Sequence, residues 1–208
     1  MDNHVNDSIG GAHLFNGKNV DFVEDRFGRA KSAVRFSDGY YQVPPGVYFK
    51  GDFSISVWVK AINIPIAGGR IIDFGNGVSG PSDNVQFITS FGATAKPVFK
   101  IYLKQFETHL ESSLPLIIGQ WTHLVFTQSD STGTLYMNGL KISQNSDMYI
   151  PRNVNRALNF IGKSYSDSER NLWMDLDDLQ FYKKSMTQAE VNGLFLQQIK
   201  GQQFNDYK

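Results

Sequence analysis

Apolar and polar residues alternate along several short segments of the chain, a pattern typical of β-strands with one face toward a core. The clearest is segment 52–61 (DFSISVWVKA), where every second residue from Phe53 onward is apolar. Segment 121–127 (WTHLVFT) alternates too, and it places Leu124 and Phe126 on the face that we expect to be inner. Both segments therefore predict strands of an all-β protein.

Turn-forming residues separate these segments from others of the same kind. Asn138-Gly139 lies between two short apolar runs and predicts a tight hairpin, because both central residues of a type I′ turn need a positive φ. Residues 1–30 are rich in Asn, Asp and Gly, and we expect a loop with brief edge pairing there. Further strands are expected at 33–36, 40–43, 70–74, 84–91, 97–103, 107–111, 155–162 and 174–183.

One helix is expected near the C-terminus. Thr187 and Glu190 have the spacing of a capping box, and Val191–Phe195 supplies the apolar residues of one helix face. Strands recur at about the spacing of a sandwich or barrel, so the 208 residues are expected to form a single domain. Its core would span about 12–197, followed by a polar tail at 198–208 that frays.

Composition narrows the classes of function. Lys and Arg together number 20 and so do Asp and Glu, so the protein has no net positive charge to attract nucleic acid or an anionic membrane. The absence of cysteine excludes disulfides and thiolate metal sites. No apolar run is long enough to insert into a membrane. The polar N-terminus has no apolar signal core, which leaves two alternatives: a protein not secreted in this way, or a Met1 that is not the native start.

Four stretches, in this order, resemble a known family. They are 25–36 with Asp38-Gly39, then 53–60, then 119–139, and last 176–187 leading into the helix. Together they resemble a laminin G-like domain of the concanavalin A-like lectin/glucanase superfamily. The resemblance implies a jelly-roll sandwich of two curved antiparallel sheets with a short C-terminal helix. The chain departs from the family pattern at 173–176, where the family usually has a small residue.

The resemblance also implies a metal site. Many members of this fold bind calcium where the early Asp-Gly turn meets the late Asp-Asp strand, which here indicates Asp38 and Asp177. Calcium prefers six to eight oxygen ligands, and carboxylates and loop carbonyls supply them. The alternative is structural: Asp38 caps its turn and Asp177 bonds to backbone amides at a strand end. The sequence leaves both alternatives open.

Aromatic and polar residues share the outward faces of the two alternating segments. Trp58 and His123 would stand there, and so would Trp121. Sugar rings stack on aromatic side chains while polar neighbours bind their hydroxyls, so Trp58 and His123 are candidate glycan contacts. In the alternative interpretation, a loop covers these residues and they form a second small core.

Two polar loops are candidate rims of a binding site. Residues 73–84 include Asn76, Asp83 and Asn84, and a second loop begins at Tyr165. Long loops in compact domains often carry function, although a solvated connection is the alternative.

Enzyme signatures are missing. The superfamily's glucanases carry Glu-x-Asp-x-x-Glu on one strand, whereas 175–180 lacks the second acid. With the resemblance, this makes the first hypothesis a non-catalytic recognition module, outside the cell or at its surface, that binds a glycan (carbohydrate or glycoprotein) or another protein partner, either with calcium or without it. The second is a structural spacer in a larger protein, and the third is a divergent glycosidase or polysaccharide lyase. The sequence indicates no oligomeric state.

Overall fold

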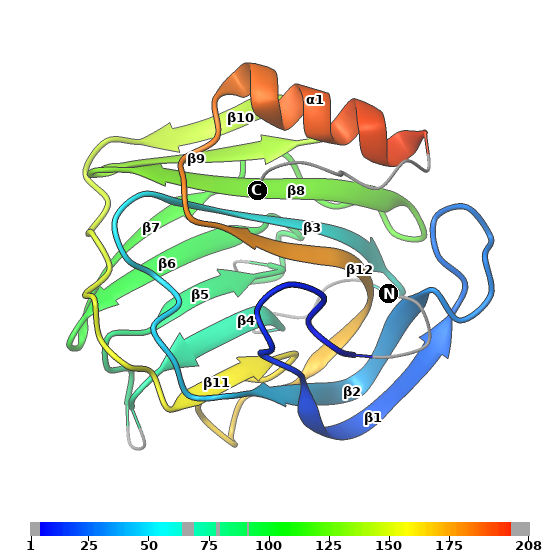
Figure 1. Ribbon diagram of the computed structural model, residues 1–208, viewed down its shortest axis with the longest axis horizontal. Coiled ribbons are helices and arrows are strands. Elements are labelled where there is room, and N and C mark those ends of the chain that lie inside the picture. Colours follow the sequence, from blue (N-terminus) through cyan, green and yellow to red (C-terminus); the bar gives the residue numbers. More distant parts are fainter. Residues whose placement is uncertain (1–4, 64–68, 78–79, 91, 201–208) are drawn as a thin grey trace.

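The computed structural model describes residues 5–63, 69–77, 80–90 and 92–200. Within these residues the chain forms twelve strands and one helix (Figure 1). The strands are β1 (Phe15–Val23), β2 (Ala33–Val43), β3 (Phe53–Ala61), β4 (Arg70–Gly75), β5 (Val85–Ile88), β6 (Val98–Leu103), β7 (Phe106–Glu111), β8 (Trp121–Ser129), β9 (Thr132–Met137), β10 (Leu140–Asn145), β11 (Leu158–Ile161) and β12 (Leu172–Tyr182). The helix is α1 (Gln188–Ile199).

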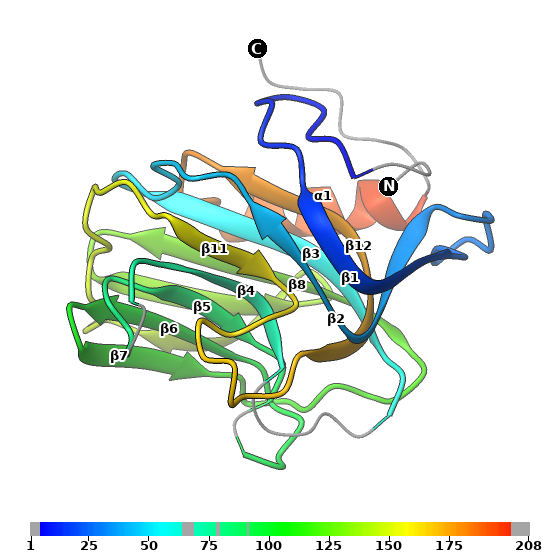
Figure 2. The ribbon, with the colours of Figure 1, turned by 90° about the horizontal axis from the view of Figure 1, so that it is seen from below.

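The strands pair antiparallel in the order β10-β9-β8-β3-β12-β2-β11-β4-β5-β6-β7, and β1 pairs with β2. Strand β2 pairs with β12 up to Gly39 and with β11 from Tyr41, so it passes from one layer to the other. We call β10-β9-β8-β3-β12 with the first half of β2 the helix-side layer, and β11-β4-β5-β6-β7 with the second half of β2 the far layer (Figure 2). The predicted sandwich of antiparallel sheets is confirmed.

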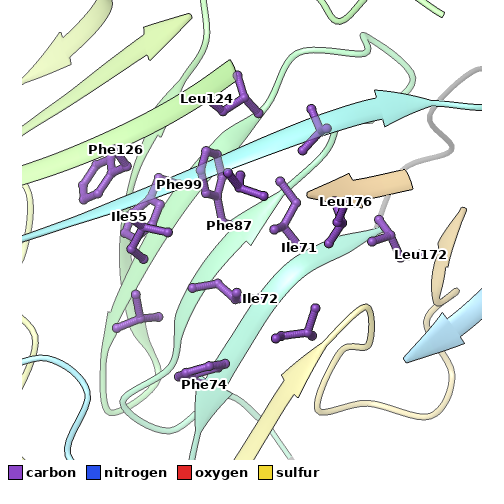
Figure 3. Close-up of a cluster of buried hydrophobic side chains, with 14 of the residues drawn as sticks. Ile55, Ile71, Ile72, Phe74, Phe87, Phe99, Leu124, Phe126, Leu172 and Leu176 are labelled. Atoms are coloured by element: carbon purple, nitrogen blue, oxygen red, sulfur yellow. The ribbon is translucent and has the colours of Figure 1, made fainter. Parts of the chain in front are cut away.

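The inner faces of the two layers meet in an aromatic core (Figure 3). The residues predicted to face inward do so: Phe53, Ile55 and Leu124 are each at most 3% exposed. Phe126 of the helix-side layer stacks on Phe99 of the far layer, with ring centroids 3.5 Å apart. This contact joins the two layers directly.

The local predictions for the hairpin and the helix are also confirmed. Asn138 and Gly139 have φ values of 51° and 80°, as a type I′ turn requires. The Thr187 hydroxyl accepts from the Glu190 amide at 3.3 Å, and the Glu190 carboxylate accepts from the Thr187 amide at 2.7 Å. Leu194 and its apolar neighbours then bury one face of the helix on β8 and β9.

The structure differs from the predictions at three places. Asp38 adopts a φ of 59° and bends β2 without interrupting it, so 33–43 is one strand. Residues 15–23 form β1 because β2 offers them a free edge. The helix continues to Ile199, and Gln198, expected in the polar tail, is 2% exposed. Residues 201–208 of that tail lie outside the described residues.

The Phe99–Phe126 contact leads to a prediction on stability. Replacing Phe126 by Ala should lower the free energy of unfolding by about 3–5 kcal/mol, because it leaves a cavity between the layers. Urea unfolding measures this, and Leu140→Ala is the control, since Leu140 is 67% exposed. A loss below about 1 kcal/mol for Phe126→Ala would contradict the assigned core.

Candidate functional site

The outward face of β3 and β8 is covered where the ligand contacts were predicted. Trp58 is 4% exposed and His123 is not exposed at all. Their rings stack at 5.0 Å, and Phe195 of α1 lies 5.8 Å from the Trp58 ring. The Trp58 indole donates to Gln198 Oε1 at 2.7 Å. The helix therefore covers Trp58 and His123, which were predicted to contact a glycan, and they form part of a second core.

The environment of His123 supports the same conclusion. Its Nε2 lies 2.8 Å from the Ser56 hydroxyl, and burial lowers the pKa of His123 to about 3, with a smaller contribution from the Arg26 charge. The imidazole is thus neutral at physiological pH. The assignment of Trp58 and His123 as ligand contacts is wrong for this structure, because neither ring has a surface that a sugar could reach.

The Asp pair of β12 is bridged by one arginine. Arg26 Nη1 lies 2.5 Å from Asp177 Oδ2, and Arg26 Nη2 lies 2.7 Å from Asp178 Oδ2. Arg26 Nη2 also donates to the Gln198 carbonyl at 3.2 Å, and its guanidinium lies 4.8 Å above the Trp58 ring. Asp177 therefore already has a cationic partner, and that partner ties the 24–32 loop to β12 and α1.

Asp38 lies far from this cluster. Its neighbour Gly39 pairs with Leu172, five residues before Asp177 on β12, which corresponds to roughly 16 Å along the strand. The Asp38 carboxylate is exposed and accepts from the Asn171 amide at 3.2 Å. Among the residues that the structure describes, no three Asp, Glu, His or Cys side chains converge on a common point. The predicted pair does not fit a shared calcium ion.

Asn84 and Tyr165 meet at a buried carboxylate on the outward face of the far layer. Asp73 is not exposed, and it accepts from Asn84 Nδ2 at 2.6 Å, Gln86 Nε2 at 2.9 Å and the Tyr165 amide at 3.0 Å. Burial raises the pKa of Asp73 to about 6, although these hydrogen bonds and the charge of Arg70 oppose the change. Asn84 thus has a structural role, and the Tyr165 backbone fixes its loop to β4.

The other two predicted loop residues also bind within the protein. Asn76 donates to the Asn155 carbonyl at 2.9 Å and accepts from the Ala157 amide at 2.9 Å. Asp83 is 5% exposed and pairs with Arg152 at 2.9 Å. The two loops are therefore pinned by their polar side chains.

Beyond the part of the helix-side layer that α1 covers, the outward face of the sheet is exposed. Arg35, Asp175, Lys60 and Trp121 stand opposite one another on β2, β12, β3 and β8. The Asp175 carboxylate is fully buried and accepts from Arg35 at 2.7 and 3.0 Å, while Lys60 Nζ lies 2.9 Å away. Lys60 Nζ also lies 5.0 Å from the centre of the Trp121 ring.

Trp173 completes this surface. It precedes Asp175 by two residues on β12, so both side chains point outward on the same face, and Trp173 is 46% exposed. Strand β3 lies between the strands of Trp121 and Trp173, so two strand spacings and two residues separate the tryptophans, about 12 Å by strand geometry. We name Arg35, Lys60, Trp121, Trp173 and Asp175 the tryptophan surface.

Sequence reasoning missed this surface. Alternation places Trp121 on the outward face, but the sequence marks Trp173 only as a departure from the family pattern. The spacing of Trp173 and Asp175 was the available signal. The pairing that brings them beside Lys60 and Trp121 needs the order of the strands.

Comparison with known families agrees with this architecture. Residues 36–192, about three quarters of the chain, match the family described as the concanavalin A-like lectin/glucanases superfamily. The chain belongs to this superfamily. No curated protein matches the sequence.

Solved structures show where this concanavalin A-like fold recurs. Domain 4 of AbnA, a GH43 extracellular arabinanase from Geobacillus stearothermophilus solved with arabinotriose, is similar over 92% of this chain and 93% of its own, with a TM-score of 0.75 and 17% identity. The binding domain of Paraclostridial Mosquitocidal Protein 1 has a TM-score of 0.68 and 19% identity over 94% of this chain and half of its own. At these identities the likeness shows the fold.

A third similar structure comes from botulinum neurotoxin type C, whose cell entry depends on interaction with two ganglioside molecules. It has a TM-score of 0.64 and 18% identity, over 89% of this chain and 47% of its own. The concanavalin A-like chain thus spans about half the length of the toxin structures. None of its described helices is long and apolar enough to cross a membrane.

The Arg26 cluster generates a prediction on stability. Arg26→Met should lower the free energy of unfolding by about 3–5 kcal/mol, because it removes the guanidinium that pairs with the buried Asp177. Urea unfolding of Arg26→Met, Asp177→Asn and the double variant forms a double-mutant cycle. The double variant should be more stable than Arg26→Met alone, since it also removes the buried charge of Asp177. Additive losses would contradict the pairing.

The raised pKa of Asp73 leads to a prediction on the pH dependence of stability. Below pH 3.8 the carboxyl is protonated in both states, whereas between pH 3.8 and about 6 only the folded state keeps the proton. The free energy of unfolding should therefore fall as pH rises through this window, by roughly 3 kcal/mol from this residue. Urea unfolding at about pH 3.5 and pH 7 for wild type and Asp73→Asn isolates the effect. The difference in free energy of unfolding between wild type and Asp73→Asn should be smaller at pH 7 than at pH 3.5 by that amount. The same difference at both pH values would refute the raised pKa of Asp73.

Proposed function

We propose that this chain is a non-catalytic module that binds glycans through the tryptophan surface. The observation that carries the proposal is the pair of outward tryptophans on one sheet face with charged donors between them. Aromatic rings bind the C–H faces of sugars, and fixed polar groups orient the hydroxyls. Trp121 and Trp173 are far enough apart to contact different units of one oligosaccharide.

The surface is preorganised for binding. Asp175 is fully buried and holds both Arg35 and Lys60, so neither cation has to be ordered when a ligand arrives. Each cation has N–H donors beyond those given to Asp175. A flat sheet face offers one shallow contact, so the affinity of a single site should be weak and useful avidity should come from several copies.

The carboxylates of both outer faces support a binding role over catalysis. A retaining glycosidase needs two carboxyl groups about 5 Å apart, one of them able to deliver a proton. Asp175 is bound by two cations, and Asp73 accepts three hydrogen bonds. On the far layer Glu107 is bound by Lys100 and Tyr102. These carboxylates are engaged within the protein.

The comparisons support the same proposal. The similar AbnA domain was solved with arabinotriose and belongs to an extracellular enzyme. We therefore propose that this module acts outside the cell or at its surface, as part of a larger protein. Calcium is not included in the proposal, because the two carboxylates expected to share it do not meet.

Trp173→Ala should abolish most glycan binding without unfolding the protein. Loss of one stacked ring should weaken binding by at least about tenfold, while an exposed side chain contributes little to stability. Affinity electrophoresis on a panel of polysaccharides measures the first effect, and thermal unfolding the second.

Phe106→Ala is the matched control, because Phe106 is a 63% exposed aromatic residue on the far layer. It should leave binding unchanged. A folded wild-type protein that binds none of the polysaccharides would overturn the proposal and favour a structural spacer. Turnover of any polysaccharide would favour the glycosidase or lyase alternative.

A further inference from the structure

A cavity of about 390 Å³ adjoins the tryptophan surface. Residues of β1, the 24–32 loop, β2 and β3 line it, and two of them, Arg35 and Lys60, also belong to the tryptophan surface. The volume lies within the range of small-molecule sites. A glycan lying on Trp121 and Trp173 would therefore pass beside its opening.

The lining of this cavity is basic. It contains Lys31, Arg35 and Lys60 and a single acidic side chain, Glu24. The remaining lining residues, Phe22, Val23 and Ala30, are apolar. The charged side chains that face a ligand in the cavity are therefore mainly cationic, although the molecule as a whole has no net charge.

Two neighbouring carboxylates, Asp175 and Asp21, offset part of this charge, but neither lines the cavity. Asp175 is fully buried beneath Arg35 and Lys60, so it fixes their positions without facing the opening. Asp21 lies opposite Arg35 in the β1–β2 ladder, outside the lining. The hydrogen bonds from Arg35 to Asp175, with a smaller contribution from the charge of Asp21, raise the pKa of Arg35. A ligand would meet the outer N–H donors of two immobilised cations and the exposed ammonium of Lys31.

We propose that this cavity recognises an anionic substituent of the bound glycan, a carboxylate or a sulfate ester. The inference rests on the proposed glycan-binding function, and it names the class of sugar. Charged N–H donors to an oxyanion make short, strong hydrogen bonds, and the cavity, which is open to solvent, presents them beside the apolar Phe22 and Val23. A cavity with apolar walls and fixed cations should distinguish sugars by whether they carry a negative charge, and less by how many hydroxyl groups they have.

The experiment uses two pairs of polymers with the same backbone. Polygalacturonate and its methyl ester differ in the carboxylate, and dextran sulfate and dextran differ in the sulfate. The charged member of at least one pair should bind at least about tenfold more tightly than its neutral partner at low salt. Raising NaCl to about 0.5 M should remove most of that preference. The pair that responds identifies the anion.

Lys31→Asn is the matched variant. Lys31 has a φ of 58°, a backbone conformation that asparagine tolerates, so the change removes the charge without new strain. It should reduce the preference for the charged polymer at least about threefold and leave the neutral polymer unaffected. Lys50→Asn is the control, since Lys50 is exposed before β3 begins, at the end of that strand remote from Lys60.

The outcomes separate the two proposals. Equal binding of charged and neutral polymers, or a Lys31→Asn variant that behaves like Lys50→Asn, would overturn the anionic inference alone, provided that Trp173→Ala still abolishes binding. If no polymer binds the folded protein, the glycan-binding function fails and the anionic inference fails with it.

Discussion

The structure depends on the burial of β3 on both of its faces. Its inward side chains pack between the layers, and its outward Trp58 is covered by α1 and Arg26. Only Lys60, near the end of the strand, is partly exposed. Because β3 is packed on both faces, the register of its neighbours β8 and β12 is fixed. That register determines which outward side chains of the three strands lie next to each other. The tryptophan surface begins where this double cover stops.

Buried carboxylates organise the polar parts of the molecule. Asp175 holds Arg35 and Lys60, Asp177 pairs with Arg26, and Asp73 gathers Asn84, Gln86 and the Tyr165 amide. An isolated buried charge is costly, so each requires its partners to stay in place. The result is rigid loops and a fixed pair of cations. The same pairing gives Asp177, which was expected to ligate calcium, a cationic side chain as its partner.

The two proposed binding features are continuous in space and complementary in chemistry. Trp173 offers an exposed apolar ring of a kind that sugars with an exposed C–H face can use, and the half-buried Trp121 lies on the same face with Lys60 over its ring. The cavity beside Lys31 adds a charge that only some sugars can satisfy. Affinity from the rings and selectivity from the cavity would then come from different residues, and each can be altered without disturbing the core. Arg35 and Lys60 connect the two, because both line the cavity and both are held by Asp175.

The sequence alone determined the strands around Phe53 and Phe126, the Asn138-Gly139 turn and the capped helix, because alternation and turn chemistry act between near neighbours. It also sorted Trp58 to the outward face of β3. Only the tertiary structure decided that α1 would cover that face and that Trp173 would stand near Trp121. Both depend on strand order and helix docking, which join residues more than 50 positions apart. Local sequence patterns do not contain information about such contacts. The predicted fold therefore agrees with the structure, whereas the proposed site lies at other residues than those predicted.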